Sequence, residues 1–192
     1  MTTTAVRLFV AINLPPSERQ AIHRATAPLR DAAQAVTWVA PECIHLTMKF
    51  LGEQPPETVM RLREALGPVG RRFSPLRLDV GGLGAFPHLR DPKIFWMGIG
   101  SDPKLELLHH DLEVACEALG HEVDARAFRP HLTLGRVKRK VSAEQAGKLA
   151  RLATGVQYRS AIEARSLDVM QSELSSNGPR YTVLAAVPLG QS

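Results

Sequence analysis

Cysteine, aromatic residues and long hydrophobic runs are all scarce in this sequence. Only Cys43 and Cys116 occur, without the close spacing of a redox pair or a zinc knuckle, which fits a reducing cytosol. No segment reaches the ~18 consecutive apolar residues that a membrane span requires. The N-terminal segment has no basic leader and no small-residue cleavage site, so we expect a cytoplasmic protein with a first strand from Val6 to Ile12.

The composition is that of a globular chain with a modest positive charge. Hydrophobic residues make up 44% and charged residues 22% of the 192 positions, which argues against disordered and fibrous classes. We therefore expect residues 1–192 to form a single domain, with room for two small lobes. The net charge of +5 suits a polyanionic ligand, and part of it is local. A basic cluster is more often a solvated face than a binding site. The basic clusters are Arg136, Lys138, Arg139 and Lys140, and Arg61, Arg63, Arg71 and Arg72.

Helical and extended patterns are interspersed along the chain. Ser17 and Gln20 have capping-box spacing for a helix that reaches about Gln34, and Ser142 and Gln145 have the same spacing for a second helix. Ser101 or Asp102 is expected to cap a third helix, with Pro103 in its first turn. A fourth helix is expected over about 57–69. The expected strands are 6–12, 36–39, 44–51, 76–86, 94–99, 131–137, 162–170 and 181–187.

The tripeptide His-Leu-Thr occurs twice, at 45–47 and at 131–133, each time on an expected strand that a helix follows. The repeat predicts two similar halves that face one another. Because side chains alternate along a strand, His45 and Thr47 are expected on one face with Leu46 on the other. His131 and Thr133 follow the same rule.

An imidazole beside a hydroxyl forms a natural half-site for a phosphate, since the hydroxyl can donate to an oxygen while the ring handles a proton. A lone histidine on a strand is usually a core or surface residue, but two identical motifs favour a functional pair. Opening a cyclic phosphate requires one group that deprotonates water and one that protonates the leaving oxygen. Imidazole can do either near neutral pH, so we expect chemistry that needs neither a metal nor a cofactor.

The two motif segments resemble a known family. HLTMKFLGE at 45–53 and RPHLTLGR at 129–136 are similar to the paired His-x-Thr motifs of the two-histidine phosphoesterase superfamily. More narrowly they resemble the bacterial and archaeal RNA 2',3'-cyclic phosphodiesterases, also called 2'-5' RNA ligases. The likeness extends over most of the chain through RLFVAINLP at 7–15, GAFP at 84–87, IFWMGI at 94–99 and GPRYTVLAAVPL at 178–189.

The resemblance implies an α+β fold of two pseudo-symmetric lobes, each an antiparallel-rich sheet with helices on its outer face and the active-site cleft between them. It implies that His45 protonates the 3' leaving oxygen and that His131 activates water, so that the product is a 2'-phosphate. Thr47 and Thr133 would bind phosphate oxygens. The substrates would be RNA ends or nucleotides with a 2',3'-cyclic phosphate, with 2'-5' ligation as the reverse reaction.

Three further residues leave alternatives open. Strict alternation aims Arg136 away from the site, but a bulge at Gly135 would reset it toward the phosphate, as the resemblance favours; otherwise it belongs to the solvated basic run. Lys49 has the parity of His45 and is either a substrate-binding or a rim residue. Phe50 holds the place of Arg136 in the first half, where core packing is favoured over stacking on a base.

Other functions and sites fit the sequence less well. His109, His110, Cys116 and His121 match no familiar metal-binding spacing, so no metal site is expected. The alternatives to an RNA cyclic phosphodiesterase are a noncatalytic RNA-end binding module, a metallohydrolase, and the same machinery acting on a cyclic phosphate of ADP-ribose or on a 2'-5' linked oligonucleotide. We expect a monomer without an obligate protein partner.

Overall fold

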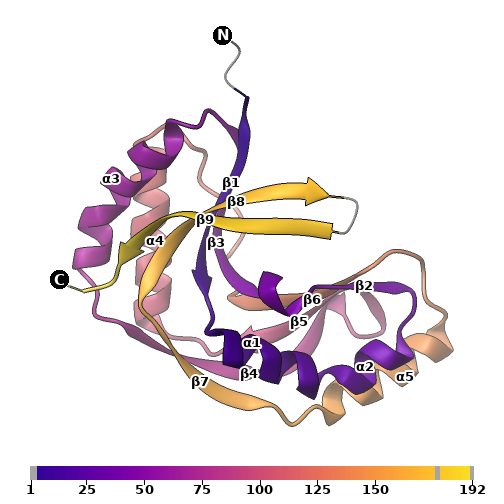
Figure 1. The fold of residues 1–192 in the computed structure, drawn as a ribbon. Coiled ribbons are helices and arrows are strands. Elements are labelled where there is room, and N and C mark those ends of the chain that lie inside the picture. Colours follow the sequence, from indigo (N-terminus) through magenta and orange to yellow (C-terminus); the bar gives the residue numbers. More distant parts are fainter. Residues whose placement is uncertain (1–3, 176–177, 191–192) are drawn as a thin grey trace.

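The computed structural model describes residues 4–175 and 178–190, whose strands form one antiparallel sheet (Figure 1). The strands are β1 (Val6–Asn13), β2 (Val36–Trp38), β3 (His45–Gln54), β4 (Leu76–His88), β5 (Asp91–Ile99), β6 (His131–Val137), β7 (Arg159–Ala164), β8 (Ser166–Ser175) and β9 (Gly178–Pro188). The helices are α1 (Pro16–Ala25), α2 (Ala27–Ala32), the short 3-10 helix η1 (Pro41–Cys43), α3 (Thr58–Arg71), α4 (Pro103–Glu117) and α5 (Ala143–Gly155).

The strand order is symmetric about its centre. It runs β7-β4-β5-β6-β3-β1-β8-β9, with β2 added on β6, so that β3 and β6, the two motif strands, are the central neighbours. They are joined through the pair Leu46 and Leu132. The expected α+β class with two similar halves is confirmed. The two expected sheets, however, are continuous with each other, because the motif strands pair side by side.

The helices gather in two groups, one over each half of the sheet (Figure 1). Helices α3 and α4 pack together, and α3 lies against β8 and β9; α2 and α5 pack together, and α5 lies against β4 and β5. The larger buried cluster joins the sheet to the first group through Leu62, Leu66 and Leu108, and a second cluster lies under α2 and α5. In the described part of the chain, no helix is long and apolar enough to cross a membrane.

Two of the three expected helix caps are confirmed. Ser142 and Gln145 form a capping box, and the Asp102 carboxylate caps α4 by accepting from the backbone N–H groups of the first turn. The start at Ser17 is wrong, because the helix begins at Pro16 without a side-chain cap. The expected single helix is also divided in two near Thr26. Pro28 follows and offers no N–H for a continuous helix.

The last strands differ in extent from the prediction. The expected strand 162–170 is two strands, β7 and β8, which separate at Arg165. They pair with different partners, β7 with β4 and β8 with β1 and β9, so the chain crosses here from one half of the sheet to the other. The β8–β9 hairpin projects beyond the sheet on the side of β2 and β6 (Figure 1).

Candidate active site

The pairing of Leu46 with Leu132 brings the two repeated motifs together. In an antiparallel pair the flanking residues also lie opposite each other, so His45 faces Thr133 and His131 faces Thr47 across the two strands. Both leucines are almost fully buried in the main core, which leaves the histidines and threonines on the opposite face, as the alternation predicts. These four side chains line one cavity of about 1530 Å³.

Both imidazoles are held by the same type of contact. The distance from His45 Nδ1 to the Cys43 carbonyl oxygen is 2.8 Å, and from His131 Nδ1 to the Arg129 carbonyl oxygen 2.6 Å. A carbonyl oxygen only accepts, so each Nδ1 carries the proton and each Nε2 is left to exchange one. His45 Nε2 lies 3.1 Å from the Thr47 hydroxyl, which donates to it when the ring is neutral. The two halves therefore present equivalent Nε2 atoms to the same cavity.

Aromatic rings pack around each histidine. Phe9 lies against His45 with ring centroids 4.9 Å apart, and Tyr181 meets the same imidazole edge-on at 5.1 Å. Phe86 meets His131 edge-on at 5.0 Å. These ring contacts restrict the orientations of the two imidazoles.

The burial of His45 changes its protonation. Desolvation lowers the pKa of His45 from 6.5 to about 4, and the hydrogen bond to the Cys43 carbonyl only partly offsets the effect. His45 is therefore neutral at pH 7 when the cavity holds no anion. The unfolded chain, with an ordinary histidine pKa, takes up a proton at a higher pH than the folded chain does.

This difference predicts that His45 costs stability at acid pH. Between pH 6.5 and pH 4 the unfolded state binds the additional proton, so the free energy of unfolding falls as the pH falls, by about 1.4 kcal/mol for each unit of pKa difference at most. We expect His45→Asn, which keeps an N–H for the Cys43 carbonyl but does not titrate, to weaken this dependence. Urea unfolding of both proteins between pH 4 and pH 7.5 measures it. Parallel curves for the two proteins would contradict the assignment.

Arg136 reaches the face of the histidines through a bulge in β6. Along β5, Trp96 pairs with Thr133 but the next residue, Phe95, pairs with Gly135. Leu134 is therefore the extra, unpaired residue of the bulge, and it shifts the alternation of side chains between the two faces of β6 by one position. Arg136 thereby shares the face of Thr133 and lines the same cavity. The expected reset of parity is confirmed.

Glycine is required beside this bulge. A Cβ atom on Gly135 would lie 2.7 Å from Cε3 of Trp38, which pairs with it from β2.

Burial raises the pKa of the Tyr181 hydroxyl, and the charge of Arg136 acts against that rise. Arg136 of one half thus lies within electrostatic reach of Tyr181 of the other.

A matching bulge in β3 overturns the expectations for Lys49 and Phe50. Val10 pairs with Lys49 and Ala11 with Thr47, which makes Met48 the additional residue. Lys49 consequently turns to the core side with Val10 and is 5% exposed, so its expected parity with His45 is wrong. Phe50 turns to the side of His45 instead; it is 65% exposed and lies 5.9 Å from the Phe9 ring, so the expected core packing is also wrong.

The sequence did not single out Phe9, Phe86 or Tyr181. They belong to segments that carry the family resemblance, but their contact with the histidines depends on strand pairings that local patterns do not specify.

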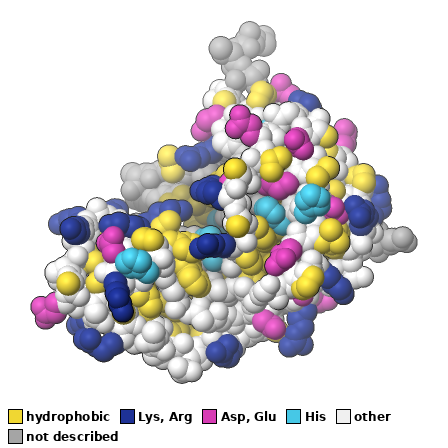
Figure 2. All heavy atoms as spheres, turned by 180° about the vertical axis from the view of Figure 1, so that it is seen from behind, with side chains coloured by type: hydrophobic (Ala, Val, Ile, Leu, Met, Phe, Trp, Pro, Cys, Tyr) yellow, Lys and Arg dark blue, Asp and Glu magenta, His cyan; other side chains and the backbone are white. Residues whose placement is uncertain are grey.

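Basic and hydrophobic side chains border the hollow in the middle of the face drawn in Figure 2. Among the described residues, no group of three or more His, Cys, Asp or Glu side chains could hold a metal ion.

The family model of the 2'-5' RNA ligase superfamily matches residues 13–172. Among curated proteins, the chain is 32% identical over 176 residues to the RNA 2',3'-cyclic phosphodiesterase of Archaeoglobus fulgidus. This alignment covers 92% of this chain and 96% of the relative. It is 33% identical over 181 residues to a protein of the same name from Geobacillus stearothermophilus. That match covers 94% of this chain but only 56% of the relative's length.

Solved structures agree with these relatives. The structure of TT0787 of Thermus thermophilus superposes with a TM-score of 0.78 at 26% identity, and covers 97% of this chain and 100% of its own. Escherichia coli LigT complexed with 3'-AMP superposes with a TM-score of 0.76 at 27% identity, over 97% of this chain and 99% of its own. The region that the family model matches contains both His-x-Thr strands and most of the residues that line the cavity. The chain belongs to the 2'-5' RNA ligase superfamily.

Proposed function

We propose that this chain is an RNA 2',3'-cyclic phosphodiesterase that opens terminal cyclic phosphates to 2'-phosphates by general acid-base catalysis. The observation that carries the proposal is the pairing of the two His-x-Thr strands, which sets two imidazoles and two hydroxyls on one face of the sheet. In this proposal residues 1–192 act as a single two-histidine phosphoesterase domain of two lobes, as a monomer in the cytoplasm.

The mechanism uses the two Nε2 atoms on opposite sides of one phosphorus. His131 accepts a proton from water as the water oxygen attacks phosphorus, and His45 donates a proton to the 3' oxygen as its bond to phosphorus breaks. Thr47, Thr133 and Arg136 donate hydrogen bonds to the non-bridging oxygens and stabilise the additional negative charge. One water is consumed, no covalent intermediate forms, and no cofactor takes part.

The assignment of His45 as the acid requires that it gain a proton with the substrate. Burial holds the pKa of His45 at about 4 in the free chain, and an anionic phosphate beside the ring favours the charged imidazolium. Proton uptake is therefore coupled to binding of the substrate. If a 5'-hydroxyl takes the place of water, His131 accepts its proton as its oxygen attacks the phosphorus of the cyclic phosphate, His45 protonates the departing 3' oxygen, and the product is a 2'-5' bond.

Three further observations support RNA as the substrate. Phe50 exposes its ring at the rim of the cavity, where it can stack on a base whatever the sequence. The curated relatives at 32% and 33% identity are named RNA 2',3'-cyclic phosphodiesterases. The net charge of +5 favours binding of a polyanion.

The test is to incubate the purified chain with an oligoribonucleotide that ends in a 2',3'-cyclic phosphate, in the presence of a chelator, and to identify which ribose oxygen keeps the phosphate. We expect a 2'-phosphate. A 3'-phosphate would reverse the assigned roles of the histidines. Binding without hydrolysis would favour a noncatalytic RNA-end binding module, and loss of turnover on chelation would favour a metallohydrolase. Faster hydrolysis of a cyclic phosphate of ADP-ribose would change the substrate class.

A further inference from the structure

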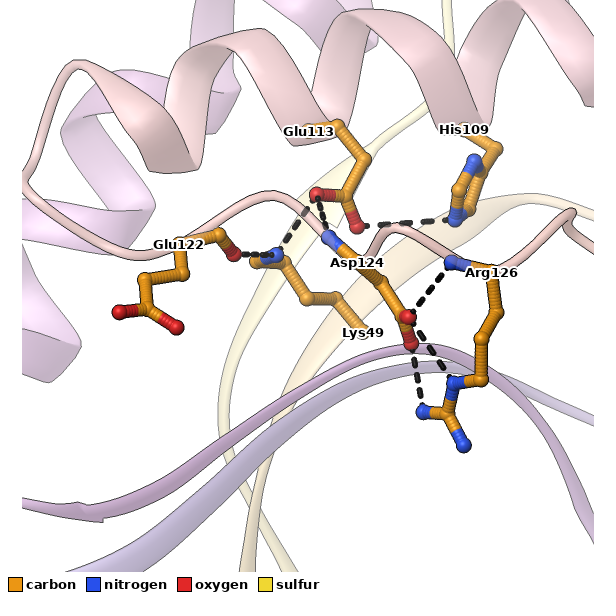
Figure 3. Close-up of polar contacts among 6 residues, drawn as sticks. All are labelled: Lys49, His109, Glu113, Glu122, Asp124 and Arg126. Carbon is orange, nitrogen blue, oxygen red and sulfur yellow. Dashed lines mark hydrogen bonds and ion pairs between the residues drawn. The ribbon is translucent and has the colours of Figure 1, made fainter.

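A largely buried polar cluster on the core side of β3 borders the same cavity as the two histidines, and its members Lys49, His109 and Glu113 are among the lining residues. The Lys49 ammonium lies 2.7 Å from the Glu113 carboxylate, and these two side chains are 3% and 7% exposed (Figure 3). His109, one turn earlier on α4, lies 3.6 Å from the other Glu113 oxygen, which is too long for a hydrogen bond. We call Lys49, His109 and Glu113 the Glu113 cluster.

The Glu113 cluster holds the segment that connects α4 to β6. Lys49 Nζ donates to the Glu122 carbonyl at 2.7 Å, and the Glu113 carboxylate accepts from the Asp124 backbone N–H at 3.3 Å (Figure 3). The His109 ring stacks on Phe128, with centroids 3.9 Å apart and planes 10° apart. Residues 121–130 form neither helix nor strand, so these side-chain contacts hold the segment in place of a regular pattern of backbone hydrogen bonds.

This connecting segment is part of the active site. Residues 120–129 line the cavity that holds the two histidines, and the segment leads directly into His131. Its Arg129 carbonyl accepts the His131 Nδ1 proton at 2.6 Å. On the opposite side of the cluster, Lys49 follows Thr47 by two residues on β3. The Glu113 cluster therefore contacts both motif strands, one directly and one through the connecting segment.

We propose that Lys49, His109 and Glu113 are positioning residues, which hold the connecting segment 121–130 and thereby orient the His131 imidazole for its role as the base. This inference rests on the proposed function. A buried ion pair is not required for stability, because apolar side chains of similar volume are often as stabilising. Apolar side chains cannot replace the hydrogen bonds that the ion pair makes with the Glu122 carbonyl and the Asp124 N–H.

The experiment separates positioning from stability with a double variant. Lys49→Met alone leaves the Glu113 charge buried and unpaired, and its loss of activity could reflect unfolding. Lys49→Met combined with Glu113→Leu removes both charges, so we expect a melting temperature close to that of the wild type. We expect its kcat for a cyclic-phosphate oligonucleotide to fall up to about 100-fold, since a small displacement of the base is costly. KM should change little.

Arg72→Gln is the matched control. It breaks the ion pair of Arg72 with Asp111, which also lies on α4 but outside the cluster, and should leave kcat unchanged. A second readout needs no turnover: hydrogen exchange of the backbone amides of residues 121–130, which should be faster in the double variant than in the wild type and in the control.

Each outcome decides the proposal. Wild-type kcat in the double variant overturns it, as does a lower kcat without faster exchange in residues 121–130. If the wild type does not hydrolyse the substrate, the proposed function fails instead. Unchanged exchange in the double variant would then still overturn the positioning of the segment.

Discussion

His45→Ala and His131→Ala are each expected to lower kcat for a terminal 2',3'-cyclic phosphate by about 10²–10⁴-fold, the usual contribution of a positioned general acid or base. Each variant removes one proton transfer while the other Nε2 atom and the phosphate-binding hydroxyls remain. Single-turnover rates measured with saturating enzyme separate this loss from weaker binding. Because both histidines act in one transition state, the kcat of the double variant should be only slightly lower than that of the less active single variant.

His110→Ala is the control for these variants. His110 is exposed on α4, outside the residues that line the cavity, so its replacement should leave the rate unchanged. Retention of wild-type turnover by either cavity variant would exclude that histidine as an acid or base. Equal losses in all three variants would point to a general defect in folding.

Arg136→Met is expected to lower kcat/KM by about 10–100-fold, because a hydrogen bond to a charged group contributes roughly 1.5–3 kcal/mol. The bulge in β6 directs this side chain to the face of Thr133, where its charge can meet a non-bridging phosphate oxygen. Arg136→Lys should recover part of the loss, since lysine keeps the charge but not the planar fork.

Arg139→Met is the matched control for Arg136. Arg139 is an exposed member of the same basic run and does not line the cavity. We expect a small effect that disappears as the salt concentration rises. Equal effects of Arg136→Met and Arg139→Met at all salt concentrations would favour the alternative interpretation, in which the whole run is a solvated basic face.

Local patterns were sufficient to predict the two motif strands. The alternation of His45 and His131 with buried leucines depends only on the period of a strand, and the repeat of His-Leu-Thr indicated two equivalent halves. Gly135 also signalled the bulge that redirects Arg136, because glycine in a strand often marks one. These features belong to single segments, and a single segment can reveal them.

Features that depend on pairing between distant segments were not predictable in this way. The bulge at Met48 carries no glycine, so the equivalence of Phe50 to Arg136 in the other half was the one indication that Phe50 could turn to the cavity, and no local pattern indicated that Lys49 would turn to the core. Likewise, the contact of Tyr181 with His45 requires β9 to lie beyond β8 and β1, which only the strand order determines. The single sheet arises from the Leu46 and Leu132 pair, which the expectation of two facing sheets did not include.

The most direct test of the account is a crystal structure of this chain with a bound nucleoside 2'-phosphate, the proposed product. Two imidazoles that act on one phosphorus should both contact the same phosphate group. We expect Nε2 of His45 and Nε2 of His131 within hydrogen-bond distance of different oxygens of that phosphate, with Thr47 and Thr133 beside them. A phosphate that contacts only one histidine, or that binds outside the cavity, would contradict the central claim.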